Sequence, residues 1–123
     1  PEDYPPNCVA YVGTHDNDTA VWWTTSAEPE DVKRAYDYLG VTDAADINWV
    51  MMRAIWNSRA NLTIVLAQDL LGLGSESRMN KPSTVGSNWC WRAVEGCFTD
   101  ALAAKVRGEM ERFGRLDRPD KKV

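Results

Sequence analysis

The sequence predicts an α/β fold that contains a parallel pair of strands. Two short apolar runs, residues 8–14 and 62–68, are rich in β-branched residues and indicate buried strands. The residues between these runs carry helical periodicity, and two strands joined by a helical crossover form a parallel βαβ unit. A two-stranded parallel sheet leaves both of its edges open, so we expect the chain to be part of a larger structure.

Turn and capping residues predict the elements that surround the first strand. Residues 1–7 form a lead-in loop, because the prolines in this segment prevent a regular element. After the strand, Asn17 or Asp18 is expected to cap the short helical turn that follows. Pro29 in the first turn and Gly40 at the C-terminal end delimit the next helix.

The helix predicted over residues 43–59 is apolar on two faces. One stripe follows the helical spacing i, i+3, i+4, i+7 and i+8, and the other lies on a different face. The first stripe consists of Ile47, Val50, Met51, Ala54 and Ile55, and the second of Trp49, Met52 and Trp56. Both faces should therefore be buried. A last helix is predicted over residues 99–113, and residues 116–123 are expected to form a frayed tail.

The bulk composition excludes several classes of function. The 123 residues suit one domain, and the net charge of −4 argues against a nucleic-acid partner. No apolar stretch is long enough to cross a membrane, and no leader segment is recognisable. The three cysteines and single histidine have no metal-ligand spacing, so we expect no metal and no cofactor. Reduced, partly buried thiols indicate a cytoplasmic protein.

Polar residues follow both predicted strands. His15 and Asp16 come after the first strand, and Gln68 and Asp69 come at the end of the second. Function collects at the C-terminal ends of parallel strands, so these side chains are candidates for a site. The Asn- and Trp-rich loop over residues 78–92 would stand above the same face.

Each candidate also has a purely structural alternative. The "THDND" turn could simply cap a helix, with His15 as a satisfied buried imidazole. Asp69 could cap the short helical turn that follows it. Trp49 and Trp56 are expected in the core, whereas Trp89 lies in a loop where either role is open.

Two motifs carry a family resemblance. "GTHDNDT", residues 13–19, resembles the fourth conserved region of the amylomaltases, or 4-α-glucanotransferases (disproportionating enzymes). "QDLLGLGSESRMNKPSTVGSNWCWR", residues 68–92, is similar to the second C-terminal signature of that family. The two motifs occur in the right order, and the resemblance extends from residue 8 to about residue 115.

The resemblance implies a (β/α)₈ barrel enzyme of the α-amylase clan. Residues 1–123 would be the C-terminal part of its one catalytic barrel domain, from strand seven to helix eight, because a whole barrel needs about 250 residues. Such an enzyme transfers α-1,4-glucan segments between maltooligosaccharides, as in starch, glycogen and maltodextrin metabolism. It retains the anomeric configuration by a double displacement that uses two carboxylates. Both carboxylates belong to the missing N-terminal part, so the chain alone should be inactive.

The resemblance also implies roles for four residues. Asp16 would stabilise the oxocarbenium-like transition state, and His15 would donate a hydrogen bond to a hydroxyl of the same sugar. Asn88 would contact sugar nearby, and Trp89 would either do so or hold the loop. The alternative is a non-catalytic module, derived from the barrel, that binds α-glucan or another partner.

Three positions depart from the usual family pattern. Val12 stands where Thr is common, and Ser83 stands where Gly or Ala is common. Ser87 replaces the Gly that usually precedes the Asn-Trp pair, and serine costs more than glycine if this position needs a positive φ.

Overall fold

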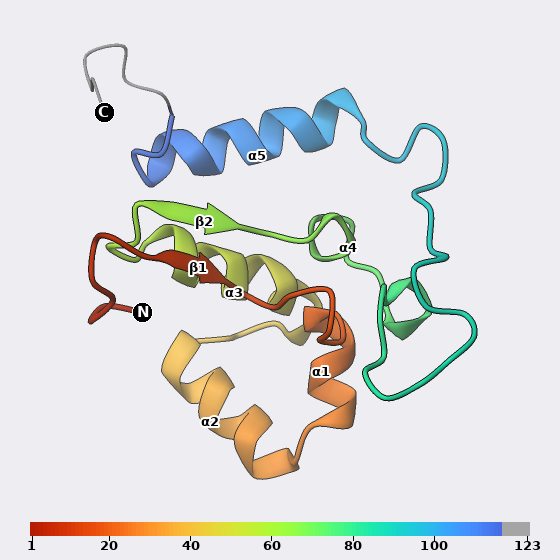
Figure 1. The fold of residues 1–123 in the computed structure, drawn as a ribbon. Helices are drawn as coiled ribbons and strands as arrows, with labels where there is room; N and C mark the ends of the chain where they lie inside the picture. Colours follow the sequence, from red (N-terminus) through yellow and green to blue (C-terminus); the bar gives the residue numbers. More distant parts are fainter. Residues whose placement is uncertain (117–123) are drawn as a thin grey trace. The chain divides into compact units, whose positions relative to one another are not determined.

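The computed structural model describes residues 1–116, and the chain forms two compact units, residues 1–92 and residues from 93 onward. Figure 1 shows the helices and strands in sequence colours. The first unit contains β1 (Val9–Tyr11), α1 (Ala20–Ser26), α2 (Pro29–Leu39), the 3₁₀ helix η1 (Ala44–Asp46), α3 (Ile47–Trp56), β2 (Leu62–Ile64), α4 (Ala67–Leu70) and the 3₁₀ helix η2 (Ser75–Ser77). The second contains α5 (Asp100–Arg112).

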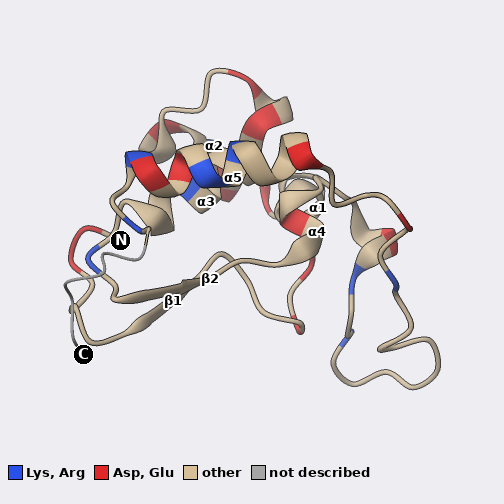
Figure 2. Ribbon diagram, turned by 90° about the horizontal axis from the view of Figure 1, so that it is seen from above, with Lys and Arg blue, Asp and Glu red and all other residues tan. Residues whose placement is uncertain are grey.

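The two strands pair in parallel, as predicted. Val9 faces Leu62 and Tyr11 faces Ile64 across the pair. The crossover between them is helical, and α3 covers one side of the pair (Figures 1 and 2). On that side Ala10 is buried, at 3% exposure.

The expectation that both strands are fully buried is wrong for this chain. The four apolar side chains on the side away from α3 are exposed by 41–53% of their surface: Val9, Tyr11, Leu62 and Ile64. No helix or strand of residues 1–92 covers this side of the pair (Figure 2). An apolar strand face of this kind normally packs against further elements.

Both strands are also shorter than predicted. β2 ends at Ile64, and α4 begins within the same apolar run, because the backbone amides of Asp69 and Leu70 bond to the carbonyl of Leu66. The predicted continuation of the strand to Gln68 is therefore wrong. A short apolar run cannot distinguish a strand from a buried helical turn by periodicity alone.

Helix α3 forms the centre of the first unit. It contacts α1, α2 and α4, and it buries six residues: Ile47, Asn48, Trp49, Met52, Ile55 and Trp56. The rings of Trp49 and Trp56 pack with their centroids 6.2 Å apart, which confirms their predicted place in the core. The second predicted stripe is thus fully buried, and the first is buried only at its two ends.

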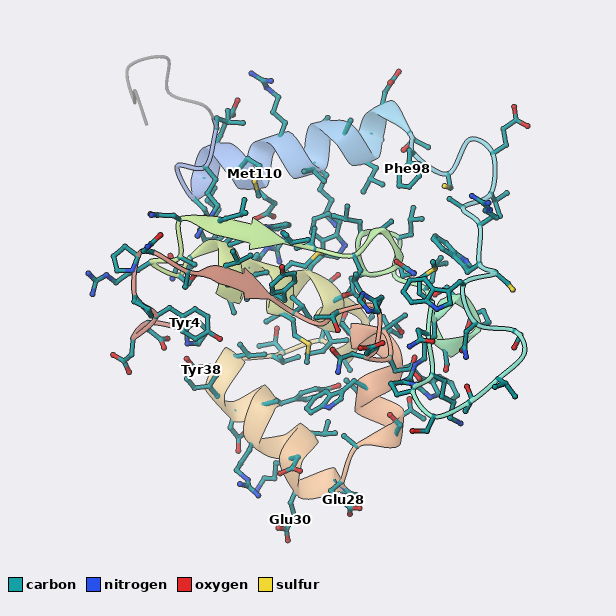
Figure 3. All side chains as sticks on the ribbon, viewed as in Figure 1. Tyr4, Glu28, Glu30, Tyr38, Phe98 and Met110 are labelled. Atoms are coloured by element: carbon teal, nitrogen blue, oxygen red, sulfur yellow. The ribbon has the colours of Figure 1, made fainter. Side chains whose placement is uncertain are left out.

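The helix ends follow local capping rules, with one correction. Thr19 is the N-cap of α1 and accepts from the backbone N–H of Trp22, so the prediction of Asn17 or Asp18 as the cap is wrong. Gly40 ends α2 in the left-handed conformation at φ 64°, as predicted. The hydroxyl of Tyr38 on α2 (Figure 3) donates to Glu2 and ties the N-terminal segment to this helix.

Helix α5 confirms the last predicted helix. Thr99 caps its N-terminus by accepting from the N–H of Leu102, and Phe113 is its C-cap. Arg107 and Glu111 form an i, i+4 ion pair at 3.4 Å on its surface. Of the tail predicted over residues 116–123, residues 117–123 lie outside the described part of the chain.

Candidate functional site

His15 and Asp16 lie in the turn that follows β1, separated by three residues from the end of the strand at Tyr11. Asn17 shapes this turn, because its Oδ1 accepts from the N–H of Thr14 at 2.9 Å and from the Thr14 hydroxyl at 3.1 Å. Both candidate side chains are exposed at this turn, His15 by 54% and Asp16 by 50% of the side-chain surface. His15 Nε2 lies 3.4 Å from Asp16 Oδ1. The alternative of a satisfied, buried imidazole is therefore wrong.

The loop that follows η2 is far from this turn in sequence but is hydrogen-bonded to it. Arg78 Nη2 donates to the carbonyl of Asp16 at 2.7 Å, and its Nε donates to the carbonyl of Asn80 at 2.8 Å. The Asn80 side-chain amide donates to Asp16 Oδ1 at 2.7 Å. Its backbone N–H donates to the carbonyl of His15 at 3.1 Å. Two segments more than sixty residues apart in sequence thus meet at the candidate carboxylate.

Asp18 is the second carboxylate of the turn, and it lies deeper. Its side chain is 15% exposed and pairs with Arg78 Nη1 at 3.3 Å. The hydroxyl of Ser75 donates to the same oxygen, Oδ2, at 2.8 Å. Asp18 therefore fixes Arg78 rather than facing solvent.

Sequence reasoning assigned no site role to Arg78, Asn80 or Asp18. Arg78 and Asn80 do stand within the "SRMNKP" part of the second motif, which was the available signal. What that motif could not show is which atoms of the first motif they contact.

Trp89 packs against His15. The ring centroids are 4.9 Å apart with the planes tilted by 46°, and Trp89 itself remains 57% exposed. The backbone N–H of Trp89 donates to the carbonyl of Met79 at 2.6 Å. Three of the four predicted site residues, His15, Asp16 and Trp89, therefore lie together.

Asn88, the fourth predicted residue, is held by its own loop. Its Oδ1 accepts from the N–H of Lys81 at 2.9 Å, and its Nδ2 donates to the carbonyl and the hydroxyl of Thr84. Ser87 is not among the described residues with positive φ, so serine meets no backbone strain there. The positive angles occur instead at Ser83 (φ 63°) and Trp89 (φ 65°).

A polar cavity of about 700 Å³ lies between α1 and this loop. Asn88, Asp18 and Arg78 line it, together with the rings of Trp22 and Trp91. Charged and aromatic groups thus line the same cavity. Of the four predicted site residues, Asn88 is the one that lines it.

Gln68 and Asp69 do not join the exposed cluster. Both are buried in α4, where Gln68 donates to the carbonyl of Ser77 at 3.0 Å. Asp69 Oδ1 accepts from the N–H of Ala20 at 2.8 Å and so caps α1, not the turn after α4. Burial raises the pKa of Asp69, and the bond from Ala20 opposes this shift.

The three cysteines, all within the described residues, are free thiols, and Cys90 is exposed rather than partly buried. Among residues 1–116, no group of three or more His, Cys, Asp or Glu side chains gathers as a metal site would require. In the same described part of the chain, no helix combines the length and apolar character needed to cross a membrane.

Comparison with known proteins decides the family. The model of the family described as 4-alpha-glucanotransferase matches residues 1–96. The chain belongs to the 4-α-glucanotransferase family. This confirms the family resemblance carried by the two motifs.

Three relatives show how much of a 4-α-glucanotransferase the chain covers. The enzyme of Clostridium butyricum is 44% identical over 118 residues, which are 95% of this chain and 24% of that protein. The enzyme of Thermus thermophilus is 37% identical over 123 residues, covering 94% of this chain and 25% of that protein. A chloroplastic/amyloplastic enzyme of Arabidopsis thaliana is 38% identical, with 94% and 21% covered. The chain thus spans about a quarter or less of these relatives.

A solved amylomaltase structure also matches nearly the whole of this chain. The amylomaltase of Streptococcus agalactiae, in complex with acarbose, superposes with a TM-score of 0.87 at 31% identity. The superposition covers 94% of this chain and 23% of that protein.

Proposed function

We propose that this chain is the C-terminal part of the catalytic barrel domain of a 4-α-glucanotransferase, from strand seven to helix eight of a (β/α)₈ barrel. The parallel β1–β2 pair with its helical crossover supports this placement. The uncovered apolar strand face supports it too, because strands of a closed barrel bury their inner side chains. So does the share of about a quarter that the chain has in its relatives.

In the proposed reaction, the longer protein transfers α-1,4-glucan segments to acceptor sugars with retention of configuration. Asp16 stabilises the positive charge that develops on the glucosyl ring at the transition state, and His15 donates to a hydroxyl of that ring. The nucleophile and the acid/base carboxylate come from outside this chain. The observation that carries the proposal is the exposed His15–Asp16 pair, bonded to the second family motif through Arg78 and Asn80.

We assign Trp89, which packs on His15, and Asn88, which lines the cavity shared by Arg78 and Asp18, to the proposed sugar site. Asn88 Oδ1 makes one hydrogen bond within the loop, so it has a second lone pair for a sugar hydroxyl. Trp89 offers an exposed aromatic ring beside His15. The complex of the related amylomaltase with acarbose supports a site of this type in the longer protein. The three free thiols fit a reducing compartment such as the cytoplasm.

Asp16→Asn in the full-length enzyme tests the role of Asp16. We expect the turnover number to fall by several orders of magnitude, because the amide removes the negative charge that stabilises the transition state while it preserves the shape of the side chain. The assay is glucose release from maltotriose. Asp31→Asn, which removes an exposed ion pair with Arg34, is the matched control and should leave turnover unchanged. A near-normal rate for Asp16→Asn contradicts the proposal.

The chain alone should release no glucose from maltotriose, because it lacks both reacting carboxylates. Release of glucose together with longer maltodextrins would refute the division of catalytic groups proposed above. The alternative, a glucan-binding module, has support in the exposed Trp89. Titration with maltoheptaose distinguishes the two: a saturable change in Trp fluorescence of the isolated chain favours the binding module.

A further inference from the structure

The carboxylate of Asp16 is held through one of its two oxygens. Asn80 Nδ2 donates to Oδ1 at 2.7 Å, and His15 Nε2 lies 3.4 Å from the same atom. Within residues 1–116, no hydrogen bond reaches Oδ2. Asn80 therefore fixes the side of the half-exposed carboxylate that carries Oδ1, and Oδ2 keeps its hydrogen-bonding capacity toward the described residues unused.

The position of Asn80 is itself fixed by main-chain bonds. Its N–H donates to the carbonyl of His15 at 3.1 Å, and its carbonyl accepts from Arg78 Nε at 2.8 Å. Arg78 also donates to the carbonyl of Asp16 at 2.7 Å. Because both main-chain segments are anchored, the short Asn80 side chain has little freedom, and its amide determines where Oδ1 points.

An amide is suited to this task because it donates without a charge. A lysine or arginine side chain at the same distance would neutralise Asp16 and weaken its attraction for a cationic sugar. Asn80 can orient the carboxylate and leave its negative charge available.

We infer that Asn80 is a positioning residue that aims the Asp16 carboxylate at the sugar. This inference rests on the proposed function of Asp16. Asn80 acts through Asp16, and its removal should slow the chemical step rather than weaken substrate binding, because a small displacement of a catalytic group has a large effect on rate.

The test uses two substitutions in the full-length enzyme. Asn80→Ala removes the donor and should lower kcat about 10- to 100-fold, with KM within about threefold. Asn80→Asp keeps the shape but places a negative oxygen against Oδ1, so it should be slower than Asn80→Ala. A purely structural role gives the opposite order, since Asp preserves the shape of Asn. Thermal unfolding of both variants checks the fold, and Asn61→Ala and Asn61→Asp serve as a matched exposed pair that should change neither rate.

A double-mutant cycle completes the test. If Asn80 acts through Asp16, Asn80→Ala should cause no further loss of kcat in the Asp16→Asn background. The inference is overturned if Asn80→Asp is as active as Asn80→Ala or more so, or if the Asn80→Ala loss repeats in full in that background. A near-normal rate for Asp16→Asn alone is a different failure, because it removes the proposed function whatever position 80 shows.

Discussion

Two residues in the loop between Arg78 and Arg92 hold backbone angles that side chains rarely adopt. Trp89, at φ 65°, is stabilised there by the bond of its N–H to the Met79 carbonyl and by its packing on His15. Ser83, at φ 63°, is exposed, and its side chain makes no hydrogen bond to the described residues that would offset the steric cost. The strain at Trp89 is therefore held by its contacts with the candidate site, whereas the strain at Ser83 is a local weakness of the loop.

Ser83→Gly should stabilise the chain by roughly 0.5–1 kcal/mol, because glycine adopts a positive φ without steric cost. Ser87→Gly is the matched control, and it should stabilise nothing because Ser87 has no positive φ to relieve. Urea unfolding of both variants measures the two free energies. Equal effects at the two positions would contradict the assignment of strain to Ser83.

At the scale of elements, a single buried carboxylate joins α4 to α1. Asp69 is 1% exposed and caps the N-terminus of α1 through the N–H of Ala20, while its own carbonyl accepts from Asn48 Nδ2 at 2.7 Å. Three helices thus meet at one residue. Since α1 begins four residues after Asp16, this junction supports the segment that carries the site.

The raised pKa of Asp69 gives this junction a pH dependence. The folded chain binds the Asp69 proton more tightly than the unfolded chain does. Ionisation of Asp69 therefore costs stability as the pH rises above 3.8, the ordinary pKa of an Asp side chain. Asp69→Asn has no such ionisation and keeps an oxygen for Ala20. Its stability relative to the parent should therefore increase from acid to neutral pH, as measured by urea unfolding at several pH values.

Asp69→Ala is the companion variant. It leaves the Ala20 N–H without its acceptor and should cost about 1–3 kcal/mol. If Asp69→Asn is as destabilising as Asp69→Ala at neutral pH, the charge itself holds the junction and the argument from burial is wrong.

The helix ends that were predicted correctly rest on local signals, because Pro29 and Gly40 delimit α2 by their own backbone preferences and Thr99 caps α5 by accepting from a residue three positions ahead. Asp69 and Ala20 are forty-nine positions apart, and no local rule connects them. The residues of the candidate site also divide into those that local sequence reveals and those that only the fold brings together. The His15–Asp16 pair was visible as adjacent residues, but the contact of Asn80 with Asp16 exists only after the chain has folded.

At the scale of the whole molecule, the uncovered face of the strand pair is the main departure from a self-sufficient domain. Val9, Tyr11, Leu62 and Ile64 form a contiguous apolar surface on two paired strands. A surface of this kind marks an interaction site or an aggregation liability. In the proposed barrel it is the part of the sheet that faces the interior.

The combined substitution Val9→Thr and Ile64→Thr should have different effects in the isolated chain and in the full-length protein. In the isolated chain it should reduce binding of a hydrophobic dye and change the free energy of unfolding by less than about 1 kcal/mol, because both side chains are already exposed. In the full-length protein it should cost roughly 1–3 kcal/mol at each position, because the proposed barrel would bury both side chains.

Ala10→Val, on the opposite side of the same strand, is the control. It overpacks a buried position and should destabilise the isolated chain by about 1–3 kcal/mol. If Val9→Thr and Ile64→Thr have equal effects in the two settings, that face is not covered in the longer protein.

The hydrogen bonds of Arg78 determine which nearby side chains can change without opening the turn. Two of the three hydrogen bonds that its side chain makes to described residues end on main-chain oxygens, those of Asp16 and Asn80, and such oxygens survive any exchange of side chain. The groups displayed at positions 15, 16 and 80 can therefore be replaced while the frame that presents them stays closed. Single substitutions at these three positions therefore change the displayed groups without removing a bond of Arg78, provided that Arg78 and its counter-ion Asp18 are kept.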